Sequence, residues 1–244
     1  MKTVPSVIEI APGVHSLRQH KGGRVHAFLL DDGQDLALID TLFDTDGGLV
    51  LQTIRRIGRS VSDLKHIIVT HGHRSHLGGL AALKRLSGAS VYAHEWESDI
   101  IASQRKAQGV TLRPIHPLNP WLQVYPLQLG LTLGLSPHPP CPVDHMVGDG
   151  DRIGPVQVLH TPGHSPGHLA LHWPERNVLF AGDAIATWPE LGPGWPAFNL
   201  NHHQHRLSLG RMANLDAQVV AVGHGEPITA RGAQLVHSIA ASLA

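Results

Sequence analysis

Three histidines stand close together directly after an apolar run. His71, His73 and His76 follow the strand-like sequence His66-Ile67-Ile68-Val69. Imidazole nitrogen is a favoured donor for zinc and other divalent metals, and loops at strand ends often carry the chemistry of a fold. The pattern indicates a metal site. Because the chain has 20 histidines in 244 residues, some close spacings also arise by chance, so one loop alone does not decide the matter.

Each of three other apolar runs also leads into a loop with potential ligands. The runs cover residues 156–159, 178–181 and 219–222. The loops are Thr161-Pro162-Gly163-His164, Phe180-Ala181-Gly182-Asp183 and Val222-Gly223-His224-Gly225. When successive strands pack side by side, their ends can gather in one cleft. We therefore expect the four loops to form one site.

The ordered motifs HxHxxH, PGH, GD and GHG resemble the metallo-β-lactamase superfamily of hydrolases, and the match runs from about Ile8 to the C-terminus. Segments 25–30 and 36–41 resemble the opening strand pair of that family, with Asp40 after the second strand. The resemblance implies an α/β fold, the αββα sandwich, in which two facing mixed sheets have helices outside. A chain of 244 residues suits one domain of this kind, spanning 1–244.

The resemblance also assigns the metal ligands and the catalytic residues. It implies that a first metal is bound by His71, His73 and His164, a second by His76 and His224, and that Asp183 bridges the two. Zinc is the expected metal, as one or two ions, with iron or manganese as alternatives.

One position departs from the family pattern. Ser75 stands where the motif usually has an aspartate. A neutral hydroxyl is a poorer ligand than a carboxylate, because such metals prefer a deprotonated donor and serine keeps its proton near neutral pH. The second metal site is therefore expected to be weak.

The expected activity is metal-dependent hydrolysis of a small molecule. A divalent cation lowers the pKa of bound water to about 7 and so supplies hydroxide to attack a carbonyl, with Asp183 orienting the attacking oxygen. Expulsion of an amine needs a proton, and the aspartate missing at Ser75 helps relatives to manage it. We therefore favour esters, lactones or thioesters, as in a lactonase or thioesterase, over β-lactams.

Three alternatives stay open. The first is a β-lactam hydrolase. The second is a persulfide dioxygenase with one iron on His71, His164 and Asp183, because segment 161–168 resembles that branch as well as glyoxalase II. The third is a degenerate metal-binding protein that lost activity with Ser75. Bound iron with oxygen consumption would favour the second, and bound zinc would favour a hydrolase.

An insert without charged side chains interrupts the helix-and-strand pattern at about 114–143. Its leucines from Leu127 to Leu135 alternate with Gln, Gly and Thr, which suits a half-buried strand or extended flap. The segment could be a lid, a dimer contact or a connection packed on the core. Trp188, Trp195 and Phe198 lie close in sequence to Asp183 and could line an apolar substrate pocket or pack against the sheet.

The remaining histidines and the lone cysteine are expected to be structural. His168 or His172 could orient a ligand through a hydrogen bond, whereas the cluster at 202–205 is expected to be a solvated helix end. Cys141 has no partnering motif around it.

The composition points to a neutral protein. Lys plus Arg and Asp plus Glu are 19 each, so no basic face for nucleic acid is expected. The first residues contain no apolar run long enough for a signal peptide, and the sequence has no uninterrupted apolar stretch of membrane-spanning length. We expect a cytoplasmic enzyme of small molecules, with a homodimer possible.

Overall fold

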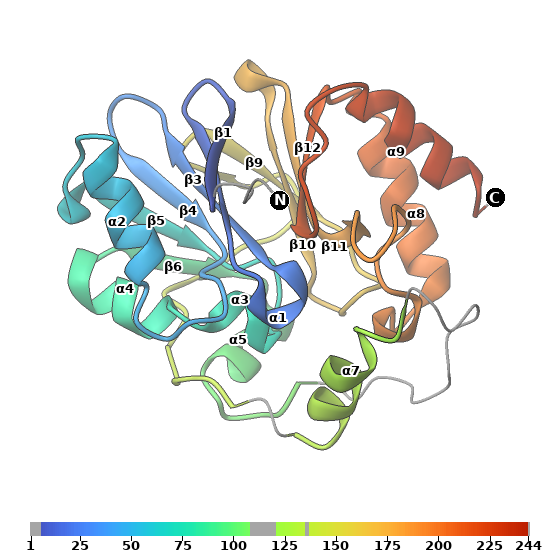
Figure 1. Ribbon diagram of the computed structural model, residues 1–244, viewed down its shortest axis with the longest axis horizontal. Helices are drawn as coiled ribbons and strands as arrows, with labels where there is room; N and C mark the ends of the chain where they lie inside the picture. The colour runs from blue at the N-terminus through green and yellow to red at the C-terminus, as the bar shows by residue number, and fades with distance from the viewer. Residues whose placement is uncertain (1–5, 108–120, 135–136, 244) are drawn as a thin grey trace, which may run out of the picture.

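Two mixed β-sheets face each other in the computed structural model, which describes residues 6–107, 121–134 and 137–243 (Figure 1). The first sheet contains β1 (Val7–Ala11), β2 (Val14–Arg18), β3 (His26–Asp31), β4 (Leu36–Ile39), β5 (Leu64–Ile68), β6 (Ser90–Ala93) and β7 (His145–Met146) in that order. The second has the order β12 (Val219–His224), β11 (Val178–Ala186), β10 (Leu169–Trp173), β9 (Val156–His160) and β8 (Arg152–Ile153). Parallel pairing holds from β4 to β7 and between β11 and β12, and the other pairs are antiparallel.

Helices cover the outer face of each sheet. The α-helices are α1 (Lys21–Arg24), α2 (Gly48–Arg56), α3 (Arg74–Leu77), α4 (Leu80–Ser87), α5 (Glu95–Ile101), α7 (Tyr125–Thr132), α8 (His202–Ala213) and α9 (Gly232–Ala241). Short 3₁₀ turns occupy Val61–Asp63, Pro174–Arg176 and Pro196–Phe198. Helices α2 and α4 lie outside the first sheet, and α8 and α9 lie outside the second. The fold is therefore the expected αββα sandwich.

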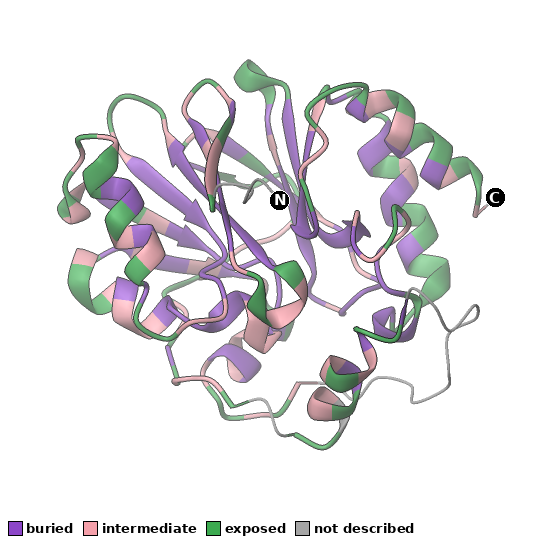
Figure 2. Ribbon diagram, in the orientation of Figure 1, coloured by how far each residue is buried: buried purple, intermediate pink, exposed green. Residues whose placement is uncertain are grey.

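Three layers of apolar side chains hold the sandwich together. Phe28, Ile68, Leu171 and Phe180 belong to the layer between the sheets. Separate clusters join each sheet to its own helices, so strand residues of both alternating sets are buried (Figure 2). Removing this area from water is the main stabilising term, at about 25 cal/mol per Å². Within the described ranges, no helix has both the length and the hydropathy that a membrane span requires.

The expectation of a strand or extended flap at Leu127–Leu135 was wrong. Residues Tyr125–Thr132 form helix α7 instead. Leucine and glutamine are good helix formers, and the proline near the start of α7 is tolerated in a first turn. Leu127 and Leu131 lie four residues apart and pack on a cluster of aromatic side chains, whereas Leu129 stays 49% exposed. Residues 114–120 and 135–136 of the expected insert lie outside the described residues.

Candidate metal centre

The expected ligands come together where the loops of both sheets meet, in the region surrounded by α1, α3, α5 and α7 (Figure 1). His71 and His73 lie between β5 and α3, and His164 lies between β9 and β10. Asp183 lies inside β11, at a place where the register with β12 shifts. Such irregularities re-aim a side chain out of the regular ladder. His224 is the last residue of β12.

Four donor atoms form a first group. His73 Nδ1 lies 3.0 Å from His71 Nε2 and 3.1 Å from His164 Nε2. Asp183 Oδ2 lies 3.6 Å from His71 Nε2 and 3.5 Å from His164 Nε2. Donors around a four-coordinate zinc, with bonds of about 2.1 Å, are about 3.4 Å apart. The spacing of these atoms therefore fits one divalent metal ion.

A second group shares the Asp183 carboxylate. His76 Nε2 lies 3.4 Å from Asp183 Oδ1, and His224 Nε2 lies 3.2 Å from Asp183 Oδ2. His76, Asp183 and His224 could thus hold a second ion beside the first. The chain provides only these three His or Asp donors here within the described residues.

Two of the donor atoms lack hydrogen-bond partners, which supports a metal. Among the described residues, His76 Nε2 and Asp183 Oδ1 are buried and accept or donate no hydrogen bond. Such orphaned polar atoms are costly unless an ion or water satisfies them. Gly223 keeps the space open, because a Cβ there would lie 2.0 Å from Asp183 Oδ1. This close approach explains the first glycine of the GHG motif.

Asp40 orients two of the expected metal ligands through hydrogen bonds on the side away from the donor atoms. It accepts hydrogen bonds from the backbone N–H of Thr70 at 2.8 Å, from Thr70 Oγ1 at 2.8 Å and from His76 Nδ1 at 2.9 Å. Because Thr70 Oγ1 donates to Asp40, it accepts from His71 Nδ1 at 3.0 Å. Both rings then carry their proton on Nδ1 and turn the lone pair of Nε2 to the metal centre, as carboxylates behind metal ligands commonly arrange.

Two further contacts orient the other side of the centre. His224 Nδ1 donates to the carbonyl of Gly23 at 2.9 Å. His168 Nε2 accepts from the backbone N–H of Asp183 at 3.1 Å, while His168 Nδ1 donates to Thr161 Oγ1 at 2.9 Å. The structure therefore gives His168 an orienting contact with the Asp183 backbone. His172 lies four residues further along the chain, in β10, and is half-buried away from the ligand groups.

Glu97 connects the two loops that carry expected ligands. The sequence patterns did not predict this role. This α5 carboxylate is 1% exposed. Its Oε2 accepts from the backbone N–H of Gly72 at 2.9 Å, between the first two histidine ligands. Its Oε1 accepts from Ser165 Oγ at 2.7 Å and from the N–H of Gly167 at 2.9 Å, in the loop of His164. The sequence feature that could have predicted its burial is the position of Glu97 on the same face of α5 as Ile100 and Ile101.

Burial and charge keep the ligand set suited to a cation. Burial lowers the pKa of His73 to about 4 and holds the pKa values of His71 and His164 well below the usual range, so these imidazoles are neutral at pH 7. Burial opposes ionisation of Asp183, but His224, His76 and His71 hold its pKa well below the usual range. The first group thus combines three neutral imidazoles with an ionised carboxylate.

His76 shows the opposite electrostatic effect. Burial alone would lower its pKa, but the carboxylates of Asp183 and Asp40 raise it to about 10. Two buried carboxylates on either side of one ring make this place favourable for positive charge.

Ser75 and two of the three aromatic residues lie at the cleft. A cavity of about 40 Å³ is lined by Ser75, Trp195 and Phe198 together with His73, Asp183 and His224. Trp195 stacks on His224 at 4.1 Å between ring centroids. Trp188 is not part of this lining and packs against Trp195 in a mostly buried cluster. All three aromatic side chains therefore pack in a buried cluster, and Trp195 and Phe198 also line the cleft.

The expectation for the histidine cluster at 202–205 needs a correction. His202 and His203 are exposed at the start of α8, but His205 is only 2% exposed. The backbone of His205 packs closely on Gly163, because a Cβ on Gly163 would lie 2.4 Å from the backbone nitrogen of His205. Helical periodicity turns His205 inward while its neighbours face solvent. Cys141 is buried in the cluster beneath α2 and α4 and belongs to neither ligand group.

Comparison with known proteins decides the family. The sequence model of the metallo-beta-lactamase superfamily matches residues 20–224. The chain belongs to the metallo-β-lactamase superfamily. A probable metallo-hydrolase of Bacillus subtilis, YflN, is 26% identical over 239 residues, which cover 91% of this chain and 88% of that protein. The hydroxyacylglutathione hydrolase GloC of Haemophilus influenzae is 27% identical, with 83% of this chain and 86% of that protein covered.

A solved structure of the superfamily agrees with the fold. The crystal structure of a metallo-beta-lactamase family protein from Thermus thermophilus has a TM-score of 0.68 and 27% sequence identity, covering 96% of this chain and 80% of that one. The two ligand groups thus lie in a superfamily of metallo-hydrolases, and their residues are the ones that could hold the metal here.

Proposed function

We propose that this chain is a metal-dependent hydrolase of esters, lactones or thioesters, with His71, His73, His164 and Asp183 holding the tighter metal. The observation that carries the proposal is that four imidazole nitrogens lie 3.2–3.6 Å from the two oxygens of Asp183, at a spacing that one or two metal ions could bridge. Gly223 leaves this space open because it has no side chain. The similarity to a protein named hydroxyacylglutathione hydrolase supports an acyl derivative of a thiol as one substrate class.

A bound divalent cation supplies a Lewis acid and lowers the pKa of a water molecule that it binds. The chain contributes orientation and exclusion of solvent. Asp183 is 4% exposed and ionised, so it can accept a hydrogen bond from an attacking water and fix its direction. Trp195 and Phe198 remove bulk water from the wall of the cleft, and a drier site strengthens every electrostatic interaction within it.

The cleft favours leaving groups that need no proton. Among the described residues lining it, Asp183 is the only carboxyl group, and its pKa lies well below the usual range. Such a group is a poor general acid at neutral pH. A thiolate or a lactone alkoxide departs without one, whereas the amine of a β-lactam requires one. The cleft therefore favours esters, lactones and thioesters over β-lactams.

A panel of substrates tests the proposal. Zinc-loaded protein should hydrolyse acyl thioesters, aryl esters and acyl lactones, and should turn over a β-lactam at least about tenfold more slowly, as expected for a reaction that lacks its general acid. The metal carried by protein purified without added metal and without a histidine tag should be zinc. Iron together with oxygen consumption on glutathione persulfide, and no hydrolysis of the panel, would replace this proposal with a dioxygenase.

A further inference from the structure

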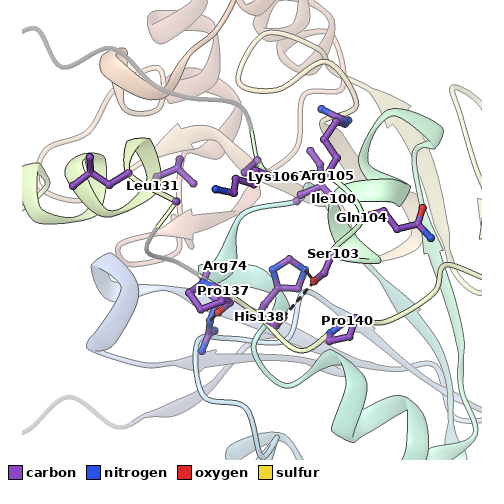
Figure 3. A pocket seen from close by; sticks show the side chains of 14 residues that line it. Arg74, Ile100, Ser103, Gln104, Arg105, Lys106, Leu131, Pro137, His138 and Pro140 are labelled. Atoms are coloured by element: carbon purple, nitrogen blue, oxygen red, sulfur yellow. Dashed lines mark hydrogen bonds between the residues drawn. The ribbon is translucent and has the colours of Figure 1, made fainter.

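A larger cavity opens beside the metal cleft. It has a volume of about 520 Å³ and lies between the residues after α5, the end of α7 and segment 137–140 (Figure 3). Gly72 and Arg74 of the histidine loop form part of its wall. Arg74 and Leu131 line both this cavity and the metal cleft. A molecule in the cavity would therefore lie next to a group that is reacting in the cleft.

The described lining of this cavity carries three cationic side chains and no carboxylate: Arg74, Arg105 and Lys106. Arg105 is already paired with Asp99, at 2.6 Å from Nε to Oδ2. Arg74 donates from Nε to the carbonyl of Pro137 at 2.7 Å and from a terminal nitrogen to the carbonyl of Phe43. Neutral carbonyls position the Arg74 guanidinium. The carboxylate that acts on it, Asp44, lies outside the cavity lining and is paired with Lys21.

Lys106 adds a cation that no described carboxylate pairs with. Its side chain is exposed and forms no ion pair or hydrogen bond with another part of the chain that the structure describes. Its ammonium lies beside the end of α7, because a Cβ on Gly134 would be 3.3 Å from Lys106 Nζ. Figure 3 shows Lys106 between the α7 residue Leu131 and the Arg105 region.

The other walls suit an organic anion. Ile100, Leu131 and Leu133 supply apolar surface, and Ser103 and His138 contact each other at 3.3 Å on the opposite wall (Figure 3). Apolar walls with a few convergent polar groups are typical of sites for small organic molecules, and the volume falls in their usual range. A small inorganic anion would leave most of this surface uncovered.

We propose that this cavity binds a carboxylate on the part of the substrate that leaves with the sulfur or oxygen atom, through Lys106 and Arg74. The proposal rests on the hydrolase function proposed above and specifies its substrate class. An anion near these two cations at low ionic strength gains Coulomb energy that a neutral analogue lacks.

A matched pair of thioesters provides the test: S-butyryl-3-mercaptopropionate and its carboxamide analogue, which differ only in the remote group. The wild-type protein should prefer the carboxylate by at least about tenfold in kcat/KM at low salt, with the difference mainly in KM and smaller at high salt. Lys106→Met should reduce that preference at least about fivefold, Lys106→Arg should retain it, and Lys106→Glu should reverse it. Lys65→Met, which changes an exposed lysine outside the cavity, should behave as wild type.

Two results would overturn the proposal. Equal kcat/KM for the two thioesters in the wild-type protein would show that the cavity does not bind the carboxylate. An unchanged preference in Lys106→Met, together with a lower Tm, would show that Lys106 only stabilises the end of α7.

If neither thioester is hydrolysed, the proposed function has failed for this substrate class. A binding experiment then tests separately whether the cavity is an anion site. Glutarate should then bind the metal-free wild-type protein at least about fivefold more tightly than it binds Lys106→Met in an NMR titration, as expected for loss of one cation. Equal binding would overturn the anion site as well.

Discussion

The carboxylate of Glu97 accepts a hydrogen bond from the backbone N–H of Gly72, 2.9 Å from Oε2, and so fixes the peptide between two of the proposed histidine ligands. The same carboxylate holds the His164 loop through Ser165 and Gly167. One buried side chain on α5 therefore sets the distance between ligand loops that are about ninety residues apart in the sequence.

Glu97→Gln should weaken metal binding more than it changes the fold. An amide has one acceptor oxygen, so its NH₂ group would face either the Gly72 N–H or the donors of the other loop. We expect about a tenfold to hundredfold loss of metal affinity, as for other groups that orient ligands, and a loss of about 1–3 kcal/mol in the free energy of unfolding. Competition with a chromophoric chelator and urea unfolding measure the two effects.

Glu95→Gln is the matched control, because Glu95 is exposed on the same helix. It should leave both quantities unchanged. Full metal affinity in Glu97→Gln would mean that the two loops hold their positions without this carboxylate.

Ser75→Asp should strengthen the second metal site. Wild-type protein should retain about one tightly bound metal per chain after stringent dialysis, because the described part of the chain gives the second group only His76, His224 and a shared Asp183. Ser75 lines the cleft beside these residues, so a carboxylate there would add a charged donor. Mass spectrometric metal analysis should show a higher second-site occupancy in Ser75→Asp and no change in Ser62→Asp, which alters an exposed serine that does not line the cleft. Two equally tight metals in the wild type would show that another group replaces the missing aspartate.

Trp195→Ala should shift acyl specificity. Trp195 covers His224 and walls a cleft of about 40 Å³, so the space for an acyl group beside the metal is small. Removing the indole should move the best acyl substrate to a longer chain, with each newly buried methylene contributing about 0.8 kcal/mol. The free energy of unfolding should fall by about 3–5 kcal/mol because a 4% exposed tryptophan is lost.

Trp188→Ala separates packing from specificity, since Trp188 is buried in the same cluster but does not line the metal cleft. It should destabilise the protein without changing the order of acyl preference. If both variants give the wild-type profile of kcat/KM against chain length, the acyl group binds elsewhere.

His26 should make stability depend on pH. Burial, Arg18 and His224 lower its pKa to about 3 from 6.5, and its Nδ1 lies 2.8 Å from Ser16 Oγ. The unfolded chain therefore binds one more proton than the folded chain between these values, so stability present above pH 6.5 is lost as the pH falls towards 3. The loss is about 1.4 kcal/mol per pH unit. Urea unfolding of His26→Gln should show a shallower decline than wild type over this range, and parallel curves would contradict the burial argument.

Local sequence patterns predicted which loops come together at the candidate site. The four ligand loops could be located because each follows a run of apolar strand residues, and strand ends in a layered sheet fold are brought to a common edge. Asp40 was noticed by its place after a strand, although its contacts with Thr70 and His76 depend on tertiary packing.

Two failures have physical causes. Alternating leucines suggested a strand at 127–135, but the helix propensity of leucine and glutamine, with packing of Leu127 and Leu131, produced α7. Glu97 was missed because its partners are backbone N–H groups and a serine from two distant loops, which no local spacing reveals. The cavity with Lys106 depends likewise on the approach of α7 to the residues after α5.

The central claim is that hydrolysis requires the metal held around Asp183. The most direct measurement is kcat/KM on a butyryl thioester as zinc is titrated into metal-free protein, for wild type, Asp183→Asn and His202→Ala. We predict no activity without metal, a linear rise to about one zinc per chain in the wild type and in His202→Ala, and a loss of at least about a hundredfold in Asp183→Asn. Hydrolysis by metal-free protein at the zinc-loaded rate, or full activity of Asp183→Asn, would contradict the account.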